Sequence, residues 1–173
     1  MSTTTETAVS TQVYRIHIRA TPEAIWDAIT KPEWTERYGY GGIVDYDLRP
    51  GGTFRARPNA AMVAAGAEMG YETPDVILDG EVIEADPPRR LVQTWRLLMD
   101  PETAAEAFTR LTWEIAAGQG GVSRLTVTHD LAGAPKTAVL VSGELEDTGA
   151  GGGWAWALSD LKTLLETGTP FAG

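Results

Sequence analysis

The stretch GAGGGWAWALSDLKTLLE, residues 149–166, decides the fold of this chain. Four of its first five residues are glycines, two tryptophans follow, and the remainder has the pattern of an amphipathic helix. Glycine costs a helix roughly 1 kcal/mol per residue relative to alanine, but it allows sharp turns and close backbone contacts. We therefore expect the last helix, residues 152–167, to close over another part of the molecule.

Apolar side chains recur on this helix at intervals of three and four residues. One face carries Trp154, Ala157, Leu158, Leu161 and Leu165, and a second face carries Trp156 and Asp160. An amphipathic helix buries its apolar stripe against another element. Because the upstream chain reads mainly as strands, the partner that the sequence predicts is a strongly curved sheet.

The chain before this helix begins with one strand and two short helices. Residues 13–19 alternate between two kinds of side chain, apolar and polar, which is typical of a half-buried strand. Thr21 and Pro22 then match the N-cap and the first position of a helix. A second short helix is predicted in residues 31–39, with Pro32 in its first turn.

Six further strands are predicted as three hairpins. Their turns fall at residues 49–52, 86–88 and 118–121, where proline and glycine gather. An alanine-rich insertion, residues 58–74, predicts a short helix between the first two hairpins, and residues 132–150 are expected to be irregular. Runs of strands with helices set apart indicate an α+β fold.

Length and composition favour a single domain, residues 12–168, after a disordered tail, residues 1–11. The sequence contains 14 Lys and Arg residues and 24 Asp and Glu residues. The resulting net charge of −10 argues against nucleic acid and membrane partners. The chain has no cysteine, which excludes disulfides and thiol chemistry. Because we recognise no targeting or membrane-spanning segment, we expect a cytoplasmic protein. A weak homodimer is left open.

Alternation along the strands gathers aromatic and polar side chains on one concave face. A mostly apolar concavity with a few polar groups is typical of a small-molecule site. The ligand-binding residues that we predict are Phe54, Met62, Gln93, Trp95, Trp113, His129, Trp154 and Leu158. The competing interpretation of Trp154 is a plain core residue, because large aromatic side chains dominate core packing.

His129 is the one histidine on the predicted inner face and the candidate for acid–base catalysis, with Glu84 as its partner. A lone histidine on an apolar face is more often structural, so we lean against an enzyme. The sequence has no nucleophile elbow, phosphate loop or dinucleotide motif. Two histidines so placed give no metal-ligand cluster. We expect neither a cofactor nor a metal.

The order of elements resembles the helix-grip fold of the Bet v 1/START-like (SRPBCC) superfamily, in its branch related to the activator of Hsp90 ATPase (AHSA1-like). Three places carry the resemblance: IRATPEAIWDAITKPEWTERY; DLRPGGTFR with DGEVIEADPPRRLVQTW; and THDL with GGGWAWALSDLKTLLE. The resemblance implies a single START-like domain in which a curved antiparallel sheet wraps around the long C-terminal helix, with a cavity between them. The insertion at residues 58–74 departs from the shorter connection of many relatives.

Three functions are compatible with this resemblance, because the fold hosts several. The first is binding of a small apolar or aromatic ligand, polyketide- or lipid-like, by a carrier or a sequestering antibiotic-resistance protein. The second is an aromatase/cyclase- or hydrolase-type enzyme that uses His129. The third is an Hsp90 co-chaperone-like interaction module. We favour the first.

Overall fold

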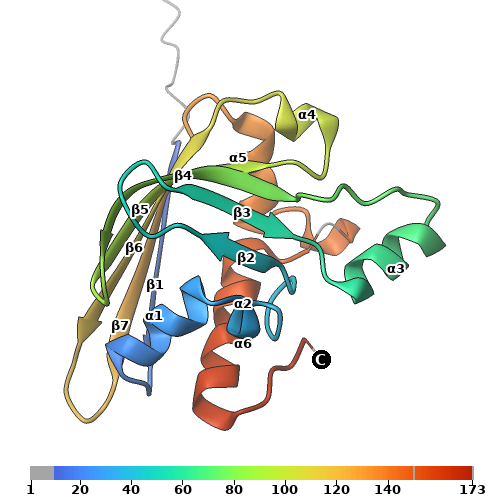
Figure 1. The fold of residues 1–173 in the computed structure, drawn as a ribbon. Helices are drawn as coiled ribbons and strands as arrows, with labels where there is room; N and C mark the ends of the chain where they lie inside the picture. Colours follow the sequence, from blue (N-terminus) through green and yellow to red (C-terminus); the bar gives the residue numbers. More distant parts are fainter. Residues whose placement is uncertain (1–9, 150, 173) are drawn as a thin grey trace, which may run out of the picture.

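The computed structural model describes residues 10–149 and 151–172. Its sheet has seven antiparallel strands in the order β1-β7-β6-β5-β4-β3-β2 and curves around the last helix, α6 (Figure 1). The strands are β1 (Thr11–Ile18), β2 (Ile43–Tyr46), β3 (Thr53–Arg57), β4 (Leu78–Asp86), β5 (Arg90–Leu97), β6 (Thr109–Ala117) and β7 (Ser123–Asp130). The predicted α+β helix-grip fold is confirmed.

The helices are α1 (Pro22–Thr30), α2 (Pro32–Thr35), α3 (Ala60–Glu68), α4 (Pro101–Ala104), α5 (Pro135–Ser142) and α6 (Gly153–Thr167), and a 3-10 helix covers Glu146–Thr148. Thr21 is the N-cap of α1, as predicted, because its side chain accepts a hydrogen bond from the backbone N–H of Ala24 at 3.1 Å. None of the helices in the described ranges has the length and apolar character needed to cross a bilayer.

The hairpins explain the strand order. Strands β2 and β3, β4 and β5, and β6 and β7 are each consecutive in sequence and adjacent in the sheet. The first strand, β1, pairs instead with the last one, β7, from Thr11 opposite Asp130 to Ile18 opposite Ser123. Most of the expected disordered tail lies outside the described residues, but Thr11 already belongs to β1.

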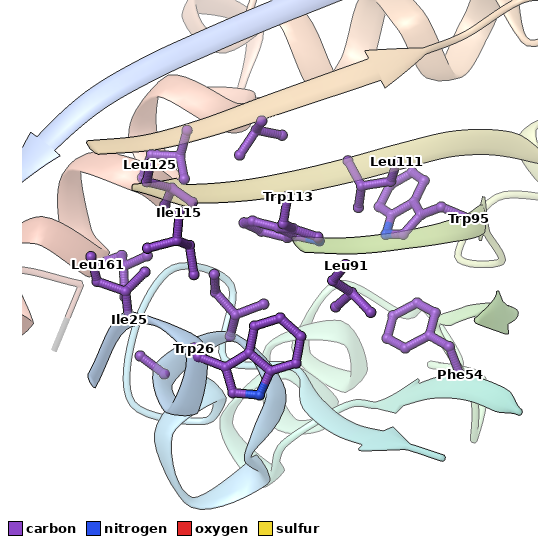
Figure 2. Close-up of a cluster of buried hydrophobic side chains, with 14 of the residues drawn as sticks. Ile25, Trp26, Phe54, Leu91, Trp95, Leu111, Trp113, Ile115, Leu125 and Leu161 are labelled. Carbon is purple, nitrogen blue, oxygen red and sulfur yellow. The ribbon is translucent and has the colours of Figure 1, made fainter. Parts of the chain in front are cut away.

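The hydrophobic core lies between the concave face of the sheet and the helices α1 and α6. Figure 2 shows Trp95, Leu111 and Trp113 of the sheet on the side that faces Ile25 of α1 and Leu161 of α6. All five are buried. The apolar stripe predicted for α6 therefore has the partner that the sequence predicted, since Leu158 and Leu161 are both in this cluster.

The glycines before α6 have a role that differs from the expected one. Gly153 has a positive φ of 64°, and a Cβ atom there would overlap the carbonyl oxygen of Val141 at the end of α5. The close approach that we predicted therefore occurs, but it brings the start of α6 against α5 rather than against the sheet.

The expectation that residues 132–150 are irregular is wrong, because they contain α5. Its N-cap, Ala134, makes no side-chain hydrogen bond. The Glu106 carboxylate instead accepts hydrogen bonds from the backbone N–H groups of Lys136 and Thr137, at 2.8 and 2.9 Å, and from the Thr137 hydroxyl at 2.6 Å. The signal for this helix start thus lies about thirty residues away in the sequence.

Replacing Glu106 by alanine is expected to lower the free energy of unfolding by roughly 1–2 kcal/mol, the usual cost of losing a helix cap. Urea unfolding followed by circular dichroism measures this loss. Glu102→Ala is the matched control, because Glu102 is an exposed carboxylate that binds the Lys136 side chain without capping α5. Equal losses for the two variants would contradict the capping role.

Candidate functional site

A row of three side chains crosses the concave face of the sheet. Gln93 of β5 lies directly opposite Leu111 of β6, which in turn lies opposite His129 of β7. Trp95 and Trp113 occupy neighbouring positions on the same face. Gln93 and His129 are fully buried, with 0% of their surface exposed. The sheet register thus brings together four of the predicted site residues.

His129 is held at both ring nitrogens. The indole Nε1–H of Trp154, from the first turn of α6, donates to His129 Nδ1 at 3.0 Å. His129 Nε2 lies 2.7 Å from the Thr109 hydroxyl, which donates to the backbone carbonyl of Trp95, also at 2.7 Å. An indole N–H can only donate, so Nδ1 is the acceptor and Nε2 carries the proton that Thr109 receives.

This chain of hydrogen bonds requires a neutral imidazole. Burial lowers the pKa of His129 from its ordinary value of 6.5 to about 4, against the opposing effect of the Asp130 charge. A proton on Nδ1 would point at the Trp154 N–H and break their hydrogen bond. At neutral pH, His129 therefore connects β7, β6 and α6 as an uncharged residue.

Aromatic rings surround the Trp154 indole. Its centroid lies 5.4 Å from that of Trp113, 5.8 Å from that of His129 and 6.4 Å from that of Trp95, with the rings edge-on or tilted. Trp95, Trp113 and His129 belong to three adjacent strands. We call these three rings the aromatic box. Trp154 enters it from α6 and is itself only partly buried.

Two buried polar atoms at this face have no hydrogen-bond partner among the described residues. They are Gln93 Nε2 and Trp113 Nε1. The other half of the Gln93 amide is fixed, because its Oε1 accepts a hydrogen bond from the Tyr46 hydroxyl at 2.7 Å. A buried donor without an acceptor costs roughly 1–3 kcal/mol, so both atoms offer a hydrogen bond to whatever reaches them.

The remaining predicted residues lie around this group. Phe54 is buried and stacks on Tyr46, with ring centroids 4.6 Å apart. Leu158 is buried on α6, and Met62 of α3 packs against the core from its edge. The sequence interpretation missed Tyr46 and Thr109, since nothing in their local sequence distinguishes them from ordinary strand residues.

Glu84 does not point inward as the catalytic alternative required. Its side chain is 51% exposed and pairs with Arg90 at 3.2 Å on the outer face of the sheet. The register of β4 and β5 shifts between Val82 and Glu84, which is the mark of a β-bulge. The bulge places Glu84 opposite Val92 of β5, on the face of the sheet away from His129.

Two hollows lie on the outer face of the sheet. The larger, about 450 Å³, is lined by residues that include Arg15, Arg90 and Arg124, and the smaller, about 310 Å³, lies beside Thr94 and Phe108. Neither lies between the sheet and α6, where the aromatic box and Trp154 pack together. Within the described ranges, no cluster of three or more His, Asp or Glu residues could hold a metal ion.

The sequence matches the family model described as Activator of Hsp90 ATPase homolog 1-like protein over residues 19–166. No match was found among the curated proteins. Solved structures share the fold at low sequence identity. CalU16 from Micromonospora echinospora is 20% identical with a TM-score of 0.62, and the match covers 92% of this chain and 76% of that one.

Two other solved structures are similar. DynU16, a protein of the dynemicin biosynthetic locus, is 19% identical with a TM-score of 0.62, and the match covers 93% of this chain and 49% of that one. PFC0360w, an HSP90 activator from Plasmodium falciparum, is 19% identical with a TM-score of 0.59, with 90% and 96% covered. The resemblance drawn from the sequence is confirmed: the chain has the helix-grip fold of the SRPBCC superfamily and belongs to the Activator of Hsp90 ATPase homolog 1-like family.

Proposed function

We propose that this protein binds one small, flat, largely aromatic molecule between the concave face of its sheet and α6. The observation that carries the proposal is the pair of unpartnered buried donors, Gln93 Nε2 and Trp113 Nε1, on an otherwise apolar face. Folded proteins pair nearly all buried polar groups. A ligand oxygen that accepts from these donors would supply the missing bonds, while the aromatic box would supply the apolar contact.

The role that fits such a site is a carrier or a sequestering protein, and sequestration of a toxic natural product is the antibiotic-resistance form of that role. The likeness to DynU16, a protein of the dynemicin biosynthetic locus, adds the compounds made by such a locus to the candidate ligands. His129 favours binding over catalysis, because its pKa is lowered to about 4. A general base that works near neutral pH needs a pKa closer to that pH.

Binding is tested by tryptophan fluorescence and thermal unfolding with aromatic polyketides, enediynes, fatty acids and sterols. A ligand that binds the native state raises the melting temperature. Trp113→Phe keeps the ring character and removes the N–H donor, so the affinity for the best ligand is expected to fall about tenfold. Trp34→Phe on α2 is the matched control and is expected to leave the affinity unchanged.

Two results would count against the proposal. One is the absence of binding by every class of compound in the panel. The other is a ligand whose affinity does not respond to Trp113→Phe, since it would bind elsewhere on the molecule. Either result would favour a protein partner that binds the outer face of the sheet.

Membership of the family favours a second candidate, an interaction with the chaperone Hsp90. This candidate predicts that the purified protein binds Hsp90 and raises its rate of ATP hydrolysis. Calorimetry and an ATPase assay with the two purified proteins measure both effects. If neither is detected while an aromatic ligand binds, the first proposal stands alone.

A further inference from the structure

We propose that the Trp154 indole occupies the place of the ligand, and that the ligand displaces it. The ligand class follows from the groups that the ligand would meet once Trp154 has moved. It is a flat aromatic molecule with an N–H or O–H donor for His129 Nδ1 and carbonyl oxygen for Gln93 Nε2 and Trp113 Nε1. This inference rests on the proposed function and adds the binding mode and the chemical class.

A ligand in the aromatic box needs room. The two hollows described above lie on the outer face of the sheet and provide none there. On the inner face, the aromatic box is in contact with Trp154, so a molecule that enters it has to move a side chain. Trp95, Trp113 and His129 are buried and belong to strands that are paired on both sides. Trp154 belongs to α6 instead, so strand pairing does not fix its position.

Trp154 is easy to move. It is the second residue of α6 and follows three glycines, and the N-cap of this helix makes no side-chain hydrogen bond. Trp154 is partly exposed, whereas the residues of the box are buried. Rotation of one side chain at a weak helix start would therefore open the box toward solvent while the close backbone contact of Gly153 with Val141 stays in place.

The vacated site presents one hydrogen-bond acceptor and two donors. Because the Nε2 proton of His129 is committed to Thr109, Nδ1 can only accept, and it requires a donor from the ligand. Gln93 Nε2 and Trp113 Nε1 can only donate, and they require an acceptor. Gln93 lies on β5 and His129 on β7, and these strands are two strand spacings apart, about 10 Å. This distance suits a ligand of about two or three fused rings.

The same polarity excludes two of the commoner apolar ligands. A fatty acid carries a carboxylate, and the site residues named here provide no cation to pair with it. A buried unpaired charge is costly. A sterol offers one hydroxyl donor but no carbonyl on a flat ring system. An aminated or hydroxylated aromatic ketone or quinone satisfies both requirements.

The test uses three probes that share a three-ring skeleton and differ in their hydrogen-bonding groups. 2-Aminoanthraquinone has both donor and acceptor, anthraquinone lacks the donor, and 2-aminoanthracene lacks the acceptor. Loss of either group is expected to weaken binding about tenfold. Trp154→Phe removes the indole N–H that competes for His129 Nδ1, so this variant is expected to bind 2-aminoanthraquinone about tenfold more tightly than the unmodified protein.

Trp156→Phe is the matched control on the same helix. Trp156 packs against Tyr40 and Phe171, away from the aromatic box, so its replacement is expected to leave the affinity unchanged. In the unmodified protein, the indole N–H signal of Trp154 in a 15N NMR spectrum is expected to shift when the probe binds. Trp154→Phe assigns that signal, and thermal unfolding shows whether each variant is folded.

The outcomes separate the two proposals. If no probe and no member of the wider panel binds, the proposed function fails. If a ligand binds and responds to Trp113→Phe, but Trp154→Phe binds it equally or more weakly and the indole signal does not move, the proposed function stands and displacement of Trp154 is overturned. Tighter binding by Trp154→Phe together with the signal shift supports both.

Discussion

Replacing Asp160 by alanine is expected to lower the free energy of unfolding by about 3 kcal/mol. Asp160 lies in the middle of α6 with 0% of its surface exposed. One carboxylate oxygen accepts a hydrogen bond from the backbone of Gly39 at 2.8 Å. The other accepts from Phe171 at 2.7 Å and from Ala172 at 3.4 Å. Alanine would leave these backbone N–H groups without their charged acceptor.

Urea unfolding measures the loss. Ser159→Ala is the matched control, because Ser159 is an exposed neighbour on the same helix whose hydroxyl bonds only to Ala155. It is expected to change the free energy of unfolding by less than about 0.5 kcal/mol. The loss in the free energy of unfolding for Asp160→Asn is expected to lie between those for Asp160→Ala and Ser159→Ala. An asparagine amide keeps one acceptor oxygen but turns an NH₂ group toward a backbone donor. A loss below about 1 kcal/mol for alanine would mean that other contacts hold the loop and the C-terminal segment to α6.

Acid is expected to destabilise the protein through His129, well above the pH at which ordinary carboxylates titrate. The unfolded chain binds a proton at this residue with a pKa near 6.5, whereas the folded protein does so only near pH 4. Because the unfolded state binds more protons between these values, stability falls as the pH is lowered through this window. The expected loss is about 2 kcal/mol between pH 7 and pH 5, rising to about 3 kcal/mol near pH 4.

The measurement compares the free energy of unfolding of the unmodified protein and of His129→Gln at pH 7, 6 and 5. The variant cannot take up a proton at position 129, so its curve is expected to be nearly flat over this range. Carboxylates with a lowered pKa, such as Glu106, are present in both proteins and cancel in the difference. Parallel curves for the two proteins would show that His129 titrates normally and is not held neutral.

Much of the fold could be predicted from the sequence, because local patterns decide it. Alternation in the strands and the glycine- and proline-rich turns predict the three hairpins. The apolar stripe of α6 predicts its partner. The same alternation predicts Gln93, Trp95, Trp113 and His129 on one face, and the register confirms that they share it.

What the sequence could not predict depends on remote or irregular contacts. α5 was missed because its cap comes from Glu106, far from it in the sequence. Glu84 stayed open as a partner for His129, because the bulge that turns it to the outer face is an irregularity that the alternation of β4 does not reveal. Asp160 was read as a polar residue on a second helix face, since the backbone groups that it binds come from a loop and from the C-terminal segment.

The pairing of β1 with β7 has a consequence for the order of assembly. Every other pair of neighbouring strands is also consecutive in the chain, whereas β1 has to find a partner that begins at Ser123. During synthesis, β1 therefore waits, unpaired, until the chain through Asp130, about three quarters of the 173 residues, has left the ribosome. Contacts so distant in sequence slow folding. We expect closure of this sheet edge to be the late step, and the newly made N-terminal strand to be the segment most in need of protection from other chains.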